Sequence, residues 1–230
     1  MKILFLALGS YKVKDTTGHD ADNFDRQLLY AISLTRLSGL VANHDAEILV
    51  VDNTVSSAQS LHPPLQKALS LPKIAATLFS QDNALGHKNK GAGEYGMCRF
   101  ALEKRRDLFE QADWVVYYTI RHTMPFPLIF EHLKKYPDYD AIVSSAEYFF
   151  PDGTMSVPGS EIFDDLIFAM KKQVFIKYID SMDPELLVKK RLGSEQNLYQ
   201  FLAGGSFNYK QVERFGVFRY DYVSNQMQVV

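Results

Sequence analysis

The sequence predicts an α/β fold, in which a mainly parallel sheet is flanked by helices on both faces and followed by a mixed C-terminal third. Up to residue 146, short apolar runs alternate with helical patterns in the order β-α-β-α-β-α-β-α-β, with short connections. The runs are apolar throughout, as in strands that are buried on both faces. After residue 146 the alternation stops, and a Pro151-Asp152-Gly153 turn signal indicates a different arrangement.

Composition limits the classes of protein to consider. The chain has 230 residues, of which 47% are hydrophobic and 23% charged, as in a globular protein of one large α/β domain or two small ones. Its net charge of -2, with dispersed Lys and Arg, argues against a nucleic-acid partner. The single cysteine, Cys98, excludes an intrachain disulfide and fits a reducing compartment. Because no run approaches ~20 apolar residues, we expect no membrane span and a cytoplasmic location.

The first two strands are predicted from apolar runs that end in polar residues. Ile3–Leu8 is ended by Gly9; it is too short for a signal peptide and continues into a polar loop. Between the strands, Phe24–Val41 has a helical apolar face and a cap at Asn23. Glu47–Val51 forms the second strand.

The same alternation continues through three more strands. His62-Pro63-Pro64 opens a short helix at Leu65–Leu71, and a helix follows the turn at Leu85–Arg99 and runs to about Leu108. Pro127–Tyr136 is the next helix. The remaining strands of this part are Ile74–Ser80, Trp114–Ile120 and Ala141–Ser145.

The C-terminal third is predicted to contain a hairpin, helices and a strand. Tyr148–Val157 is the hairpin, and Phe163–Tyr178 is an amphipathic helix with Phe163, Ile167, Met170 and Val174 on one side. Leu186–Leu202 holds another helix, with a break at Gly193-Ser194. The aromatic-rich tail Phe207–Val223 returns as a strand.

Polar residues stand at the carboxyl ends of the predicted strands, which is where α/β sheets bind ligands. These ends are Gly9-Ser10, Asp52-Asn53, Gln81–Asn83 and Arg121-His122. We therefore expect a binding site at this edge of the sheet.

The turn Leu85–Arg99 has the features of an anion site. Gly86, Gly91 and Gly93 let the backbone bend and approach a ligand, and Lys88 and Lys90 place cations beside a helix N-terminus. A phosphate is the usual ligand of such a turn. The alternative is a tight solvated turn, because neither GxxxxGK[ST] nor GxGxxG is present.

Four segments in this order resemble the nucleotide-sugar-dependent glycosyltransferases of GT-A fold. They are EILVVDNT, the stretch from Gln81 to Arg99, ADWVVYYTIRH and GSEQNLYQFL. DDLIFAMKKQVF is also similar to a segment of small bacterial enzymes of capsule or lipopolysaccharide synthesis. The resemblance implies one GT-A-like domain over residues 1–230, with a nucleotide-sugar half at 1–146 and an acceptor half at 147–230.

The resemblance also implies roles for individual residues. Asp52 would accept a hydrogen bond from the nucleotide base, beside Ser10 and Asn53. Glu195, at a helix N-terminus that favours an ionised carboxylate, would be the base of an inverting transfer, with Asp165 as the second catalytic carboxylate. Asp164 would hold sugar hydroxyls, and Asp164 or Asp165 is the alternative to Glu195 as the base. Glu94 would reach a sugar, or instead pair with Lys90 at i,i+4.

The sequence departs from the family pattern where Asp-x-Asp is expected, because Thr119–His122 contains no acid. A metal normally neutralises the diphosphate there. We expect Arg121, Lys88, Lys90 and Gly91 to bind the diphosphate instead. Two alternatives stay open: Mn²⁺ or Mg²⁺ with His122 as a ligand, or a structural salt bridge for Arg121. Without a metal, His122 would contact a sugar.

The expected partners are a nucleotide-diphosphate sugar donor and a saccharide or lipid-linked acceptor of surface polysaccharide synthesis. Peripheral contact with the inner face of the membrane is a further expectation, based on basic residues of the C-terminal third: Lys171, Lys172, Lys177, Lys189, Lys190 and Arg191. The alternative function is a non-catalytic nucleotide-binding or nucleotidyltransferase-like module.

Overall fold

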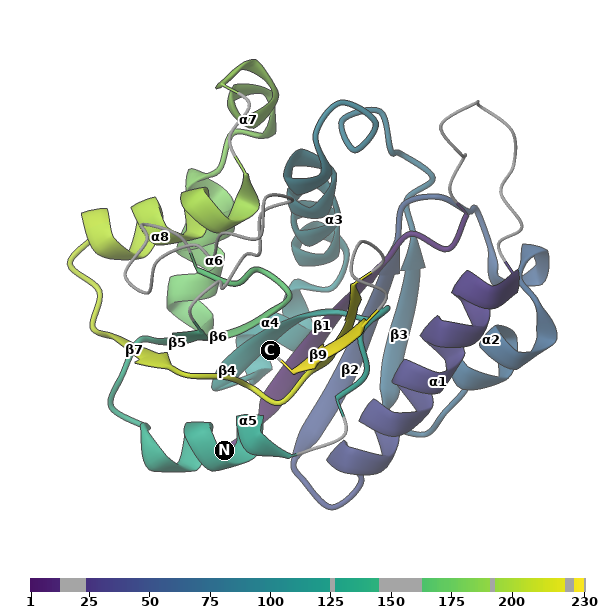
Figure 1. Ribbon diagram of the computed structural model, residues 1–230, viewed down its shortest axis with the longest axis horizontal. Helices are drawn as coiled ribbons and strands as arrows, with labels where there is room; N and C mark the ends of the chain where they lie inside the picture. The colour runs from purple at the N-terminus through teal and green to yellow at the C-terminus, as the bar shows by residue number, and fades with distance from the viewer. Residues whose placement is uncertain (13–23, 125–126, 145–162, 191–192, 222–225, 230) are drawn as a thin grey trace.

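The centre of the molecule is a twisted sheet (Figure 1). A computed structural model describes residues 1–12, 24–124, 127–144, 163–190, 193–221 and 226–229. Within these residues the main sheet has seven strands in the order β3-β2-β1-β4-β6-β5-β7. The strands are β1 (Ile3–Gly9), β2 (Ala46–Asp52), β3 (Ile74–Phe79), β4 (Trp114–Thr119), β5 (Ala141–Ser144), β6 (Ile167–Lys171) and β7 (Tyr209–Val212).

Strand pairing confirms the mainly parallel sheet. β1 lies between β2 and β4, parallel to both, and Leu6 stands opposite Leu49 on one side and Tyr117 on the other. β3 is parallel to β2, and β7 is parallel to β5. β6 is antiparallel to β4 and to β5, between which it lies.

Helices cover both faces of the sheet, as predicted. One face is packed by α1 (Phe24–Val41), α2 (Pro63–Ala68) and α5 (Leu128–Lys135). The other is packed by α3 (Lys90–Lys104), α4 (Arg106–Gln111), α6 (Lys172–Ser181), α7 (Pro184–Lys190) and α8 (Ser194–Gly204). A 3₁₀ turn at Ala58–Ser60 precedes α2, and β8 (Phe218–Asp221) and β9 (Gln226–Val229) form a separate antiparallel pair.

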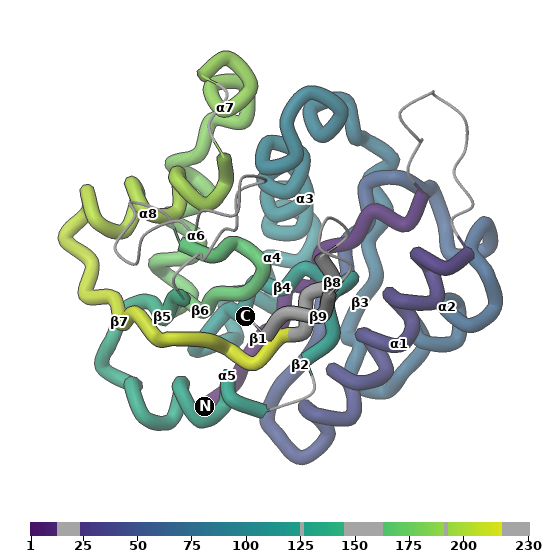
Figure 2. Tube along the Cα trace, viewed as in Figure 1, coloured from purple at the N-terminus to yellow at the C-terminus, as the bar shows by residue number. Residues whose placement is uncertain are grey.

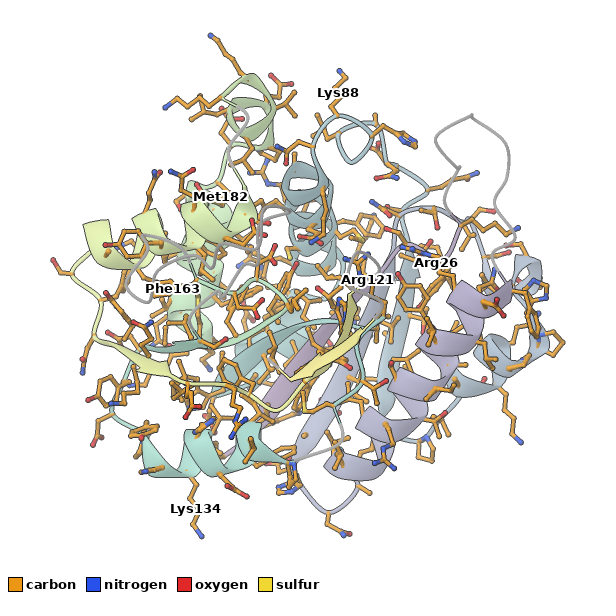
Figure 3. The ribbon with its side chains drawn as sticks, in the orientation of Figure 1. Arg26, Lys88, Arg121, Lys134, Phe163 and Met182 are labelled. Atoms are coloured by element: carbon orange, nitrogen blue, oxygen red, sulfur yellow. The ribbon has the colours of Figure 1, made fainter. Side chains whose placement is uncertain are left out.

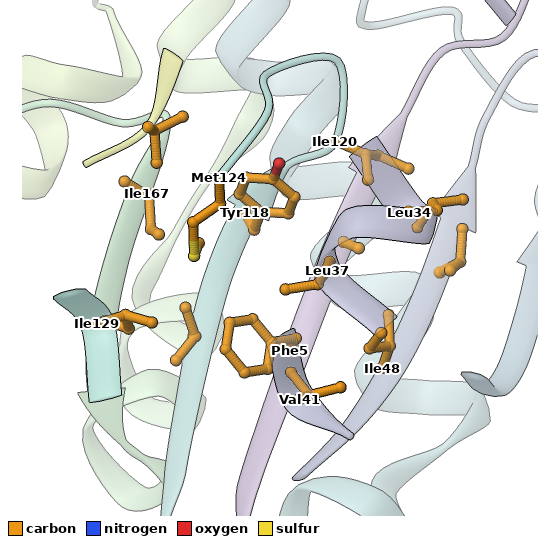
Figure 4. Packing of buried hydrophobic residues seen from close by; sticks show 14 of the residues in the cluster. Phe5, Leu34, Leu37, Val41, Ile48, Tyr118, Ile120, Met124, Ile129 and Ile167 are labelled. Atoms are coloured by element: carbon orange, nitrogen blue, oxygen red, sulfur yellow. The ribbon is translucent and has the colours of Figure 1, made fainter. Parts of the chain in front are cut away.

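Alternating side chains of the strands build the two cores. Ile3, Phe5 and Ala7 of β1 pack on the α1 side, while Leu4, Leu6 and Leu8 pack on the α3 side. Figure 4 shows Leu34, Leu37 and Val41 of α1 against Phe5 and Ile48. Since β1 is buried on both faces, its residues are apolar without interruption.

One helix prediction is wrong. Phe163–Tyr178 is not a single helix, because residues 167–171 form β6 and α6 begins only at Lys172. Ile167 and Ala169 pack into one core, and Phe168 and Met170 into the other. A strand buried on both faces has no polar alternation, so its residues also satisfy a helical pattern.

Other boundaries differ by smaller amounts. The helix predicted to run to Leu108 is interrupted at Arg105, whose φ of -137° ends α3, and whose guanidinium binds Asp107. The break predicted at Gly193-Ser194 is present, since Gly193 is the N-cap of α8 and Ser194 is its first residue. The predicted tail strand corresponds to β7 and β8.

Parts of the prediction lie outside the described residues. These include the hairpin at Tyr148–Val157, the boundary at residues 146–147, the loop from residue 13 to 21 and the helix cap at Asn23. Among the helices that the structure describes, none is long and apolar enough to cross a membrane.

Candidate active site

A polar cleft of about 340 Å³ lies at the carboxyl edge of the parallel strands. The ends of β1 and β4, the residue after β2, the start of α3 and the first turns of α1 line it. Figure 2 shows the start of α3 and the end of β1 at the same edge of the molecule. The structure thus brings together five of the predicted site residues: Ser10, Asn53, Lys90, Glu94 and Arg121.

Three cationic side chains from three different elements line this cleft. Lys90 comes from α3, Arg121 follows β4, and Arg26 comes from α1. Figure 3 shows Arg26 and Arg121 on the same side of the molecule. Because their positive charges converge on one hollow, the cleft suits a ligand with more than one negative charge.

In the ranges that the structure describes, Arg121 is held in place by a hydrogen bond to the adjacent residue, His122, and not by an ion pair with a carboxylate. Its Nε donates to Nε2 of the buried His122 at 3.1 Å. The alternative of a structural salt bridge is not supported, since no carboxylate of the described residues forms an ion pair with Arg121.

Arg26 was not found from the sequence. Its Nε donates to the carbonyl oxygen of Ser10 at 2.6 Å and its Nη2 donates to the Tyr30 hydroxyl at 3.1 Å. The sequence feature that could have pointed to Arg26 is its place in the first turns of the helix that follows β1. However, only the fold turns that part of α1 toward the strand ends.

Ser10 and Asn53 join the ends of β1 and β2. The Ser10 hydroxyl donates to Asn53 Oδ1 at 3.0 Å, and Asn53 Nδ2 donates to Asn83 Oδ1 at 2.8 Å. All three side chains carry groups that can bind hydroxyls of a ligand.

Asp52 has a role that the sequence did not indicate. Its buried carboxylate accepts hydrogen bonds from the backbone N–H groups of Tyr11, Thr54 and Val55 at 2.7–2.8 Å and from the Thr54 hydroxyl. Burial raises the pKa of Asp52, and these bonds oppose that shift. Asp52 therefore holds the two loops beside the cleft, and its predicted contact with a base would require these loops to rearrange.

A cluster of carboxylates adjoins the cleft. Lys90 Nζ lies 3.4 Å from Glu94 Oε1 and 3.8 Å from Asp165 Oδ2. Ser194 Oγ donates to Asp165 Oδ2 and lies 3.5 Å from Glu195 Oε2. The starts of α3 and α8 and the segment before β6 thus place both predicted catalytic carboxylates together.

Glu94 is the carboxylate whose ionisation is most perturbed. Burial raises its pKa to about 7, although Lys90 acts to lower it. Its Oε2 is buried and has no hydrogen-bond partner within the described part of the chain. Partial burial acts to lower the pKa of Lys90, but Glu94 and Asp165 raise it above its ordinary value.

Glycines allow these elements to approach one another. A Cβ at Gly91 would lie 3.1–3.2 Å from Ser194, and one at Gly93 would lie 2.6 Å from the Cα of Gly86. Gly91 does not line the cleft, so its observed role is close packing of α3 on α8 rather than the predicted phosphate contact.

Three predicted site residues lie elsewhere. Lys88 is exposed and points outward at the rim of the molecule (Figure 3). His122 is buried beneath Arg121. Asp164 accepts from the backbone N–H of Leu166 at 2.8 Å and shapes the turn before β6. In this conformation the three do not contribute to the lining of the cleft.

Comparisons with known proteins agree with this architecture. No protein-family profile and no curated protein matches the chain. Among solved structures, a protein of Desulfovibrio desulfuricans G20 assigned as a nucleotide-diphospho-sugar transferase is 16% identical. That match has a TM-score of 0.50 and covers 93% of this chain and 80% of that one.

Two further structures are similar. The mannosyltransferase PcManGT of Pyrobaculum calidifontis, in complex with GDP-Man and Mn²⁺, has a TM-score of 0.59 and 10% identity over 92% of this chain. HddC of Yersinia pseudotuberculosis, complexed with GMP-PN, has a TM-score of 0.50 and 11% identity, covering 93% of this chain and 90% of that one.

The chain has a GT-A-like fold. At identities of 10–16%, this likeness establishes the fold alone. The chain spans only 55% of the length of the mannosyltransferase.

Among the residues that the structure describes, the donor set of this GT-A-like site does not fit a divalent cation. Within the described ranges, no three His, Cys, Asp or Glu side chains gather closely enough to hold a metal ion. Glu94 and Asp165 come nearest to such a set, and both already face the ammonium group of Lys90. The roles proposed for the residues of this site therefore do not depend on a metal.

Proposed function

We propose that the protein is a glycosyltransferase that transfers a sugar from a nucleotide-diphosphate donor to a saccharide or lipid-linked acceptor. The observation that carries this proposal is the convergence of Arg26, Lys90 and Arg121 on one cleft beside the Asp165–Glu195 cluster. The complexes of structural neighbours with GDP-Man and GMP-PN support a nucleotide ligand.

In this proposal the three cations bind the diphosphate. The guanidinium groups of Arg26 and Arg121 can each offer two N–H groups to phosphate oxygens, and Lys90 adds a point charge. They would stabilise the negative charge that develops on the leaving group, which is the usual task of the metal in such sites. Ser10 and Asn53 would hold hydroxyls of the donor.

The carboxylate cluster would serve the acceptor. An acceptor hydroxyl oxygen bonds to the anomeric carbon while the bond from that carbon to the diphosphate oxygen breaks, and Glu195 takes the hydroxyl proton. Asp165 would position this base through Ser194, which contacts both carboxylates. A carboxylate base and a single displacement invert the anomeric centre.

The binding half of the proposal is tested with nucleoside diphosphates in the presence of EDTA. We expect UDP or GDP to bind, and Arg121→Ala to weaken binding of the diphosphate at least tenfold while leaving the uncharged nucleoside nearly unchanged. Arg106→Ala, at an exposed arginine of α4, is the control. Isothermal titration calorimetry measures both ligands, and equal losses for diphosphate and nucleoside would contradict the assignment.

The catalytic half is tested by release of nucleoside diphosphate from UDP-, GDP- and dTDP-sugars. Glu195→Gln is expected to abolish release but to keep nucleotide affinity within a few-fold. If affinity is lost as well, Glu195 is not simply the base. Binding without turnover of any nucleotide-sugar, even with added acceptors, would favour the alternative of a non-catalytic nucleotide-binding module.

A further inference from the structure

The outward side of α1 is apolar, although the helix already buries another apolar side. Tyr30, Leu34 and Leu37 pack into the core. On the outward side, Leu28 is 36% exposed and Ile32 is 47% exposed. A helix at the surface of a protein normally carries polar residues there. A contiguous exposed apolar surface usually marks a site of interaction.

This side of α1 forms one wall of a groove, the α1–α2 groove, of about 700 Å³. Its apolar lining includes Leu28, Ile32 and Leu40 of α1 together with Pro64 and Leu71 from α2 and the residues after it. The groove is twice as large as the polar cleft and is separate from it, since the two have no lining residue in common. Its volume lies in the range of sites that bind small molecules, about 300–1,000 Å³.

The charges of the α1–α2 groove favour an anionic occupant. Arg36 and Lys67 are its only charged lining residues within the described chain, and no carboxylate lines it. Both side chains are exposed. If two copies of the chain met through this groove, cations would face cations without an acidic partner. An apolar hollow with basic residues at its margin instead matches a molecule with a hydrocarbon chain and a negatively charged head.

We propose that the α1–α2 groove docks the protein on a membrane by taking up an acyl chain of an anionic phospholipid, whose phosphate lies between Arg36 and Lys67. Apolar burial and attraction to the phosphate add to each other at such a surface. The proposal does not depend on the chemistry of the polar cleft.

The position of this groove has a consequence for the acceptor. α1 also carries Arg26, which lines the polar cleft, ten residues before Arg36. At 1.5 Å per residue, the two arginines are separated by about 15 Å along the helix. Docking through the α1–α2 groove would therefore hold the cleft close to the membrane, where a lipid-linked acceptor is found.

The test is co-sedimentation of the full chain with vesicles of phosphatidylcholine alone or mixed with phosphatidylglycerol. We expect binding to the anionic vesicles that weakens with salt, and little binding to phosphatidylcholine alone. The double variant Arg36→Ser/Lys67→Ser should weaken binding about 30-fold, as expected for the loss of two basic contacts. Ile32→Ser should weaken it at every salt concentration, since it removes apolar contact.

Matched controls separate the groove from the general surface. Leu186→Ser removes an apolar side chain that is 40% exposed on α7, and Lys134→Ser/Lys135→Ser removes two exposed cations of α5. These variants should bind vesicles like the wild type, and all variants should keep the wild-type melting temperature. Equal binding to both vesicle types, or equal losses in groove and control variants, would overturn the proposal. A concentration-dependent dimer that Ile32→Ser abolishes would overturn it in favour of self-association.

Discussion

At the scale of single residues, Glu94 connects burial with pH. Its folded-state pKa is about 7, compared with 4.5 for the free side chain. Between these pH values the folded chain holds a proton that the unfolded chain releases. The free energy of unfolding must therefore decrease as the pH rises from about 4.5 to 7, by about 3 kcal/mol if Glu94 acts alone.

We predict that Glu94→Gln flattens this part of the pH profile. Glutamine cannot ionise, so the variant has no proton to lose between pH 4.5 and 7. Urea unfolding at a series of pH values measures the slope, with Glu103→Gln, an exposed residue of the same helix, as the control. A slope that is unchanged in Glu94→Gln would mean that other groups set the pH dependence.

A second residue-scale prediction concerns Asp52. The variant Asp52→Asn keeps the shape of the side chain but replaces one of its acceptor oxygens with an amide donor. It therefore leaves a backbone N–H of Tyr11, or those of Thr54 and Val55, without an acceptor. We expect a loss of about 2 kcal/mol in the free energy of unfolding, measured with urea. If Asp52 served only to bind a nucleotide base, stability would stay unchanged and only nucleotide affinity would decrease.

At the scale of elements, the contact of α3 with α8 determines where the carboxylate cluster sits. The missing side chain of Gly91 lets the start of α8 approach α3, and this start carries Ser194 and Glu195. Glycine inside a helix costs about 0.5–1 kcal/mol relative to alanine, so a glycine in this position is explained by packing rather than by helix stability.

We predict that two alanine substitutions in α3 differ in their effect on turnover. Gly91→Ala would push α8 outward by a few tenths of an ångström and should decrease turnover of the nucleotide-sugar about tenfold, since small misplacements of catalytic groups are costly. Gly96→Ala meets no atom within 4 Å and should instead stabilise the fold by up to about 1 kcal/mol without changing turnover. Equal turnover in both variants would show that the spacing of α3 and α8 does not matter for catalysis.

At the scale of the whole molecule, β6 makes the two halves of the chain interdependent. It lies between β4 and β5 and pairs with both, and Phe168 of β6 stacks on Tyr117 of β4 at 4.6 Å between ring centroids. Without residues after 146, β4 and β5 would each lose the neighbour that lies between them. The sheet therefore joins the half predicted to bind the nucleotide-sugar to the half predicted to serve the acceptor.

We predict that the chain unfolds in one cooperative transition. Trp114, the single tryptophan, is buried at the start of β4 and reports on the sheet, while far-ultraviolet circular dichroism reports on all helices. Their urea midpoints should coincide. A fragment of residues 1–146 should show no cooperative transition, and separate midpoints in the full chain would contradict the single folding unit.

Features that depend on residues close together in the chain can be predicted from the sequence. The apolar runs of β1, β2 and β4 identify strands buried on both faces, and the polar residues after them indicate a site at the carboxyl edge. Ser10, Asn53 and Arg121 were predicted in this way, because parallel strands bring their carboxyl ends to the same edge, whereas Lys90 was predicted from the glycine-bearing turn that opens a helix.

Features that depend on contacts between distant residues become visible only in the folded chain. Three examples involve partners that are distant in the sequence: the antiparallel pairing of β6 with β4, the hydrogen bond from Arg26 to the Ser10 carbonyl beside the cleft, and the hydrogen bond from the Tyr11 N–H to Asp52. Local patterns report which face of a segment is apolar, but they do not report which segment it meets. Strand neighbours, side-chain partners and burial energies arise only when the packed chain brings these segments together.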